Sequence, residues 1–282
     1  MSNLGFHCHG LDHLESVIVQ NELVRGEFYN FPPDQLPELK REIEQHNIAF
    51  SVHAPLVQTP WYVNPPTLSF LCDVDEERRN LSFRMIHETM TVASDFGAEY
   101  VIAHFPTPAT DANGTGYARL REIAREGALR LEELSEKNNL PVHIEGFGPS
   151  PFLSVDFLAE VIAGSPHLRY CFDIGHMHIA SKRDGFDLYQ FTQQMTPYIG
   201  SIHIWNSRGV DDYWNFRHIP VHPSQRPEEG WADIDRLLRL ILTENPSCPI
   251  VFESGPRYPE ALGKHDFRDG VKWIKEIVST LS

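Results

Sequence analysis

The sequence lacks several features that would place it in particular protein classes. It has no run of about 18 apolar residues, so we expect no membrane-spanning helix. Its first residues lack the charged and apolar regions of a secretion signal, which predicts a cytoplasmic location. Lysine and arginine (24) are outnumbered by aspartate and glutamate (39), and the net charge of −15 disfavours a nucleic acid as the main partner.

Cysteine is also scarce, and its spacing excludes two further kinds of structure. The four cysteines are widely separated, and no two of them form a C-x-x-C pair. Neither a disulfide framework nor a thiolate zinc site is therefore expected, and buried free thiols are predicted. The residues concerned are Cys8, Cys72, Cys171 and Cys248.

Short apolar runs alternate with amphipathic stretches along the whole chain. Such alternation is typical of parallel strands joined by crossover helices. The eight strand candidates are residues 4–9, 25–30, 49–54, 100–105, 142–147, 170–174, 201–205 and 250–254. The helix candidates between them are residues 11–20, 34–46, 76–96, 117–137, 155–163, 188–196, 234–243 and 267–281. Eight such units in 282 residues predict a single (β/α)₈ TIM barrel domain over residues 1–282.

A doubly wound open sheet is the alternative arrangement of the same elements. It would usually carry a glycine-rich phosphate loop after its first strand, but here Cys8-His9-Gly10-Leu11 follows. Three long connections, residues 55–75, 106–116 and 206–230, each follow a strand. Because barrel enzymes build their sites from such loops, we expect these three connections to form the walls of a substrate pocket.

Six consecutive strand candidates deliver an imidazole or a carboxylate at or near their C-terminal ends. Such groups are costly to bury in an apolar strand unless they are paired or bound to a metal. The strand ends of a barrel converge, so side chains far apart in sequence are expected to meet. A set without thiolates suits Mn²⁺, Mg²⁺, Co²⁺ or Zn²⁺. The six residues are His53, His104, Glu145, Asp173, His203 and Glu253.

On these residues the chain resembles the xylose isomerase-like TIM barrel superfamily, which includes sugar epimerases, inosose dehydratases and endonuclease IV-type AP endonucleases. The shared pattern lies in four motifs: HIEGFG with Glu145, FDIGHMH with Asp173, IHIWNS with His203 and FESGP with Glu253. The resemblance implies that these four residues hold a divalent metal, and that Glu145 and Glu253 act as the catalytic acid and base. It also makes His176, in the Asp-x-x-His step, a substrate-binding candidate; Arg208 and His7 are weaker candidates.

Two branches of the superfamily imply different reactions. The epimerase branch implies an isomerase or epimerase that acts on a small sugar, sugar phosphate or polyol through an enediolate. A dehydratase-like lyase would use the same residues. The endonuclease branch implies a multi-zinc phosphodiesterase with additional ligands at His53, His104, His176 and His218. Its aspartate before the last histidine is missing here, where the chain reads Phe216-Arg217-His218.

The expected partner is therefore a small carbohydrate, and the expected cofactor is a divalent metal. The superfamily's sugar enzymes often pair barrels, which makes a homo-oligomer an expectation as well. The sequence leaves open the substrate, the identity and number of metal ions, and the choice between isomerase, lyase and phosphodiesterase.

Overall fold

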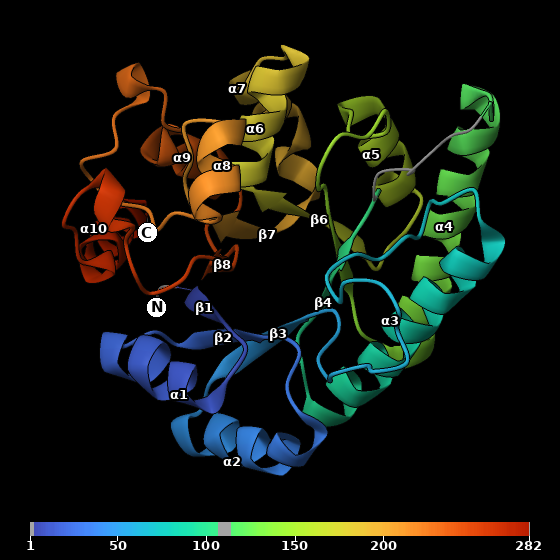
Figure 1. Ribbon diagram of the computed structural model, residues 1–282, viewed down its shortest axis with the longest axis horizontal. Coiled ribbons are helices and arrows are strands. Elements are labelled where there is room, and N and C mark those ends of the chain that lie inside the picture. Colours follow the sequence, from blue (N-terminus) through green and yellow to red (C-terminus); the bar gives the residue numbers. More distant parts are fainter. Residues whose placement is uncertain (1–2, 107–113, 282) are drawn as a thin grey trace. The chain divides into compact units, whose positions relative to one another are not determined.

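The computed structural model describes residues 3–106 and 114–281, and its eight strands form a closed parallel barrel in sequence order. The predicted (β/α)₈ TIM barrel is confirmed, with every strand within about two residues of its expected position. The strands are β1 Leu4–Cys8, β2 Arg25–Phe28, β3 Ala49–His53, β4 Val101–His104, β5 Val142–Glu145, β6 Leu168–Asp173, β7 Ile199–Ile204 and β8 Ile250–Phe252 (Figure 1).

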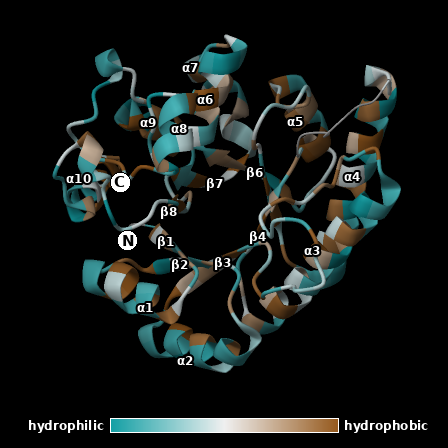
Figure 2. Cartoon of the chain, viewed as in Figure 1, coloured by the Kyte–Doolittle hydropathy of each residue, from teal (hydrophilic) through white to brown (hydrophobic). Residues whose placement is uncertain are grey.

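Helices fill the intervals between the strands. The major ones are α2 Leu36–His46, α3 Glu76–Phe96, α4 Tyr117–Asn138, α5 Val155–Ala163, α6 Ile174–Asp184, α7 Leu188–Met195, α8 Val210–Phe216, α9 Ile234–Glu244 and α10 Phe267–Ser279. Their colouring by hydropathy shows apolar residues mixed with polar ones along each helix (Figure 2). In α9 the buried residues follow helical spacing, namely Ile234, Leu237, Leu238, Ile241 and Leu242.

Two compact parts can be described separately. The first comprises residues 8–11 and 27–171, and the second comprises the rest of the described chain. Within the first part, β3, β4, β5 and the start of β6 pair side by side, with His104 opposite Glu145 and Glu145 opposite Cys171. Within the second part, β8 lies between β7 and β1, and His203 is opposite Val251.

The sequence prediction differs from the structure at two helices and at the first connection. Ile174 was expected to end a strand, but it begins α6 instead, because the side chain of Asp173 caps that helix. The expected long loop over residues 206–230 contains α8. The expected first helix, residues 11–20, consists of three short pieces: α1 Leu11–His13, a π-helical turn and a 3-10 turn.

Other expectations concern the interior and the loops. All four cysteines are buried, as predicted. No helix in the described residues is long and apolar enough to cross a membrane. Residues 107–113 of the predicted 106–116 loop lie outside the described residues, so that loop's role as a pocket wall stays a prediction.

Candidate metal centre

The first part of the chain gathers three metal-ligating side chains at the ends of adjacent strands. His53, His104 and Glu145 are the last residues of β3, β4 and β5, and all three are buried. Glu145 Oε2 lies 3.5 Å from His53 Nε2 and 3.4 Å from His104 Nε2. One potential ligand atom from each residue falls within a sphere small enough for one ion, since all three lie within 4.8 Å of one another.

Backbone carbonyls orient both imidazoles. His53 Nδ1 lies 3.2 Å from the carbonyl oxygen of Ala54, and His104 Nδ1 lies 2.5 Å from that of Thr67. A carbonyl only accepts hydrogen bonds, so Nδ1 of each ring is the donor in these contacts, and Nε2 of each ring faces Glu145. This is the arrangement by which proteins fix the tautomer of metal-ligating histidines.

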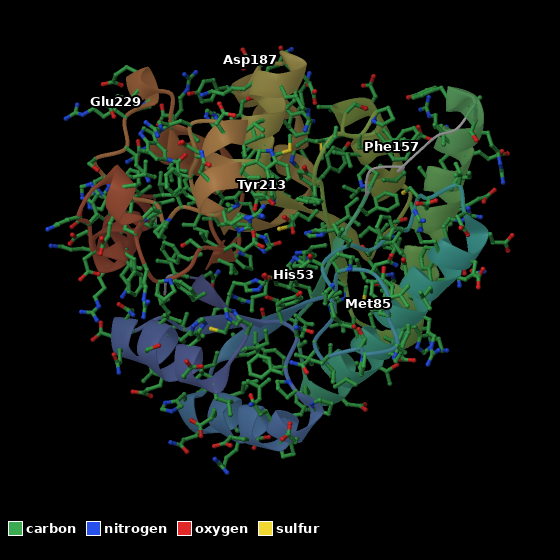
Figure 3. All side chains as sticks on the ribbon, in the orientation of Figure 1. His53, Met85, Phe157, Asp187, Tyr213 and Glu229 are labelled. Carbon is green, nitrogen blue, oxygen red and sulfur yellow. The ribbon has the colours of Figure 1, made fainter. Side chains whose placement is uncertain are left out.

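Aromatic rings enclose the same two histidines. The His53 and His104 rings meet edge to face with centroids 4.9 Å apart, and Phe147 stacks on His104 at 5.0 Å. Tyr29 meets the edge of His53 at 5.7 Å, and burial raises the pKa of Tyr29 to about 12. The phenol therefore stays protonated at neutral pH and can donate but not ionise. Figure 3 labels His53 at the end of β3.

The second part gathers three further ligating side chains in the same way. Asp173 is the last residue of β6, His203 lies in β7, and Glu253 directly follows β8. His203 Nδ1 lies 3.3 Å from Glu253 Oε2 and 3.9 Å from Asp173 Oδ2. The His203 and Asp173 side chains are fully buried, and Glu253 is nearly so. One imidazole thus faces two carboxylates at a position buried from solvent.

Trp205, two residues beyond His203, contacts this second group directly. Its indole N–H donates to Asp173 Oδ2 at 2.8 Å, and the backbone N–H of His176 donates to Asp173 Oδ1 at 2.6 Å. The indole ring stacks on His218, with centroids 4.2 Å apart and planes 12° apart. The sequence interpretation missed Trp205 because it read as one more apolar residue at a strand end. A buried indole nevertheless usually needs a hydrogen-bond acceptor, and the carboxylate of Asp173 at the end of the adjacent strand is that acceptor.

His176 and His218, both expected near the site, lie close to each other. Their ring centroids are 5.3 Å apart, and Tyr213 of α8 contacts both, at 5.7 Å from His176 and 5.9 Å from His218. His218 Nδ1 lies 2.7 Å from the backbone oxygen of Glu253. Burial raises the pKa of Tyr213, and the nearby carboxylate of Glu253 adds to the effect. Figure 3 labels Tyr213.

Arg208 is held by its own loop. Its guanidinium donates to Asp212 at 2.7 and 3.0 Å and lies over the ring of Trp231, 5.2 Å from the centroid. Burial opposes ionisation of Asp212, but the hydrogen bonds and charge of Arg208 outweigh it and lower the pKa of that carboxyl. A substrate contact by Arg208 would therefore be made from a guanidinium already fixed in direction. His7, the other substrate candidate, is the half-buried penultimate residue of β1.

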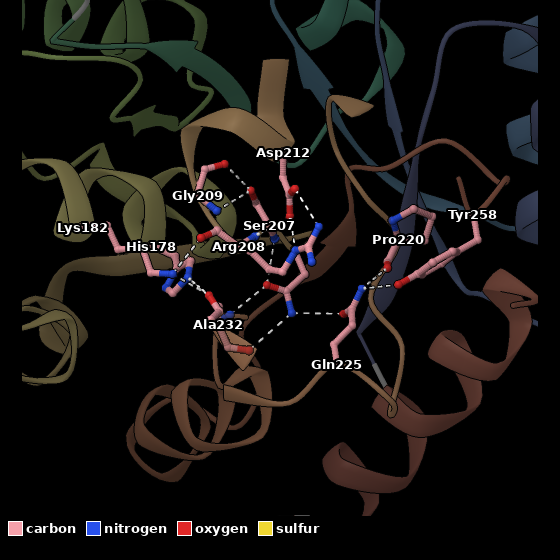
Figure 4. A network of polar contacts seen from close by, with 12 residues as sticks. His178, Lys182, Ser207, Arg208, Gly209, Asp212, Pro220, Gln225, Ala232 and Tyr258 are labelled. Carbon is pink, nitrogen blue, oxygen red and sulfur yellow. Dashed lines mark hydrogen bonds and ion pairs between the residues drawn. The ribbon is translucent and has the colours of Figure 1, made fainter. Parts of the chain in front are cut away.

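A buried amide ties together the two ends of the segment that carries Arg208. Asn206 Nδ2 donates to Gln225 Oε1 at 3.0 Å and to the Ala232 carbonyl at 3.3 Å. Its Oδ1 accepts the backbone N–H groups of Ser207 and Ala232 at 2.9 and 3.0 Å. Figure 4 shows this network together with the Arg208–Asp212 pair. The segment between β7 and α9 is thus anchored at its base.

The chemistry of the donors fits a divalent metal. Carboxylate oxygens and imidazole nitrogens are the ligands of Mg²⁺, Mn²⁺, Co²⁺ and catalytic Zn²⁺, and both groups present them. Buried carboxylates are costly without a compensating positive charge, which a divalent cation would supply.

Comparison with known proteins decides the family. A profile of the xylose isomerase-like TIM barrel family matches residues 7–277. The chain belongs to this family. None of the curated proteins is similar enough to the chain to count as a match.

Solved structures with a similar fold extend the comparison. A D-tagatose 3-epimerase-like protein is 15% identical with a TM-score of 0.75, and the match covers 100% of this chain and 98% of that one. An L-ribulose 3-epimerase is 13% identical with a TM-score of 0.73, covering 100% and 96%. The 3-keto-D-glucoside 4-epimerase from E. coli is 14% identical with a TM-score of 0.69, covering 98% and 100%. Identities this low establish a shared fold.

Proposed function

We propose that this barrel is a divalent-metal-dependent isomerase or epimerase acting on a small sugar, sugar phosphate or polyol. The observation that carries the proposal is the buried His203 placed between the carboxylates of Asp173 and Glu253 at adjacent strand ends. The similar folds of D-tagatose 3-epimerase-like protein and L-ribulose 3-epimerase support a sugar as the substrate.

Glu145 would complete the ligand set with Asp173, His203 and Glu253. Strand register supports this assignment, because Glu145 pairs opposite Cys171, two residues before Asp173. His203 likewise pairs opposite Val251, two residues before Glu253. The closed order of strands makes β6 a neighbour of both β5 and β7, so these ends follow one another around the barrel. The metal ligands would be these four residues.

The two glutamates would also move the proton. A divalent cation held by these four residues would supply Lewis acidity toward a substrate carbonyl, which makes the carbon beside it more acidic. Glu145 would take the proton from carbon on one face, and Glu253 would return a proton on the other. His176, half-buried next to Tyr213, would hydrogen-bond a substrate hydroxyl, and the fixed guanidinium of Arg208 would bind a hydroxyl or a phosphate. A lyase that dehydrates a keto-polyol would use the same residues.

A second function is favoured by one observation, the group of His53, His104 and Glu145. Its distances would allow a second cation to share Glu145, as in a multi-zinc phosphodiesterase of the endonuclease IV type. His176 and His218 would be further ligands in that case. Asp212 would not replace the missing aspartate of that type, because Arg208 binds both of its carboxylate oxygens.

Metal content and isotope exchange test the proposal together. Elemental analysis of protein purified without chelator should give about one divalent ion per chain. Ketoses and ketose phosphates incubated with the enzyme in D₂O should acquire deuterium at the epimerised carbon, and Glu145→Gln should abolish this exchange. Absence of bound metal would refute the proposal. Two or three zinc ions per chain, with incision of DNA at abasic sites that His203→Ala abolishes, would establish the phosphodiesterase instead.

Three remaining expectations belong to this proposal. A single-domain chain, a cytoplasmic location and a homo-oligomer each stay predictions. Size-exclusion chromatography with light scattering would measure the last of them directly.

A further inference from the structure

The carboxylate of Asp173 is held from two directions by donors that cannot themselves accept. One is the backbone N–H of His176 at Oδ1, and the other is the indole N–H of Trp205 at Oδ2. Each donor engages a different oxygen of the carboxylate. The two donors together therefore fix the plane and the direction of the Asp173 carboxylate.

The position of the indole is itself set by close packing. Trp205 is fully buried and stacks on His218. On another side lies Gly175 of α6: a Cβ built on it would meet three atoms of the indole ring at 2.2, 2.3 and 2.6 Å. Any side chain at position 175 would displace the ring. In the sequence Asp173-Ile174-Gly175-His176, Asp173 therefore caps the helix and Gly175 leaves the space that the indole ring fills.

The stacked imidazole connects this arrangement to a second carboxylate. His218 lies over the indole ring, and its Nδ1 is 2.7 Å from the backbone oxygen of Glu253 and 3.7 Å from Glu253 Oε2. A shift of the indole would therefore disturb the surroundings of Asp173 directly and those of Glu253 through His218.

We propose that Trp205 is a positioning residue that aims the Asp173 carboxylate at a divalent cation. The inference rests on the proposed function, in which Asp173 is a metal ligand. Groups that hydrogen-bond metal ligands typically change metal affinity by 10–100-fold when they are removed. Trp205 has no need to contact the substrate or the metal for this effect.

The test compares Mn²⁺ binding by wild type, Trp205→Phe and Trp273→Phe. Phenylalanine at 205 keeps an aromatic ring against His218 but removes the N–H donor. Isothermal titration calorimetry should give Trp205→Phe a dissociation constant about 10–100-fold higher than wild type. Trp273, on α10, supplies the matched control, and its replacement should leave the constant unchanged.

A structural role alone would not produce a defect that metal corrects. The thermal midpoint should rise with added Mn²⁺ in both proteins, and Trp205→Phe should need about 10–100-fold more Mn²⁺ to reach the same rise as wild type. Unaltered Mn²⁺ affinity in folded Trp205→Phe would overturn the inference, whereas wild type that binds none of Mn²⁺, Mg²⁺, Co²⁺ and Zn²⁺ would overturn the proposed function.

Two further experiments test the role of Trp205 if Trp205→Phe does not fold. Gly175→Ala displaces the ring while retaining the indole, so it should also weaken Mn²⁺ binding. In wild-type protein, Zn²⁺ should shift the indole N–H resonance of Trp205 in an NMR spectrum and leave that of Trp273 in place. A Trp205 resonance that does not respond to bound Zn²⁺ would count against the inference.

Discussion

Replacing Gly175 by alanine tests the packing of Trp205 by a single added methyl group. The new Cβ would lie 2.2 Å from the nearest indole carbon, about 1.2 Å closer than the 3.4 Å at which ordinary contact begins. The ring cannot give way freely, because it is fully buried and stacked on His218. Either the indole or the start of α6 must therefore move.

Two opposing effects set the magnitude. Alanine inside a helix is favoured over glycine by about 1 kcal/mol, which would stabilise the variant if the site had room. Overpacking a well-filled interior costs about 1–3 kcal/mol and sometimes more. With three ring atoms under 3.0 Å, the steric cost should exceed the helical gain. We expect the free energy of unfolding to fall by about 1–2 kcal/mol, the upper range of overpacking less the helical gain.

The assay is urea unfolding followed by far-UV circular dichroism, with near-UV spectra reporting the tryptophan environment. Gly164→Ala is the matched control, because Gly164 has ordinary backbone angles and its Cβ would approach nothing closer than 3.7 Å. The control should unfold within about 0.5 kcal/mol of wild type. If Gly175→Ala is as stable as the control and has the wild-type near-UV spectrum, the indole ring of Trp205 is not closely packed against position 175 and the reasoning is wrong.

Four further predictions address other parts of the molecule. Removing divalent metal with a chelator should lower the thermal midpoint of unfolding. Adding metal back at about 100 times its dissociation constant should raise the free energy of unfolding by about 2.7 kcal/mol, and a thermal midpoint that does not change on chelation would contradict this prediction. Glu253→Gln should reduce turnover by about 10²–10⁴-fold and leave the urea midpoint of the metal-free protein unchanged, and a fully active variant would exclude Glu253 as acid or base. Burial lowers the pKa of the His178 imidazole in the folded protein, so on acidification the unfolded chain binds a proton at His178 before the folded chain does. The free energy of unfolding should therefore be unaffected by His178 above about pH 6.5 and fall as the pH is lowered below it. Urea titrations should show a smaller fall for His178→Gln. Gly270→Ala places a Cβ 1.9 Å from the carbonyl oxygen of Val221, and should cost about 3 kcal/mol or more in urea unfolding because the clash is with backbone.

The barrel was predictable from the sequence because its strands carry a strong local signal. Runs such as Ile250–Phe252 are short, apolar and bounded by turn residues, and the helices between them show regular spacing of buried positions. Both α3 and α5 begin and end at the predicted residues, where Asp75 and Ser154 cap them through side-chain hydrogen bonds.

The elements that escaped prediction depend on contacts that a local pattern does not contain. The helix α6 begins directly after a strand because the Asp173 side chain caps it, and the same residue was read only as a metal ligand. The short helix α8 exposes Trp214 and Val210 and buries little, so it shows no amphipathic spacing.

The same limit applies to the candidate site. Imidazoles and carboxylates stand out at apolar strand ends, so His53, His104, Glu145, Asp173, His203 and Glu253 could be named from the sequence. The sequence could not show that Arg208 is already bound by Asp212, because an arginine four residues before an aspartate is common on any loop or helix. Nor could it show the indole bond of Trp205, which depends on the rotamer and on space beside Gly175.

The hydrogen bonds of the buried Asn206 amide hold the base of the segment after β7, and they do so independently of the length of that segment. Because Asn206 bonds to Ser207, Gln225 and Ala232, the base of the segment is closed whatever lies between. Doubling the length of a flexible loop whose ends are already held together costs only about 0.6 kcal/mol. Residues could therefore be inserted beside the exposed Val210 and Trp214 of α8 at small cost in stability, which makes this helix the place to alter substrate preference while the strand ends stay unchanged.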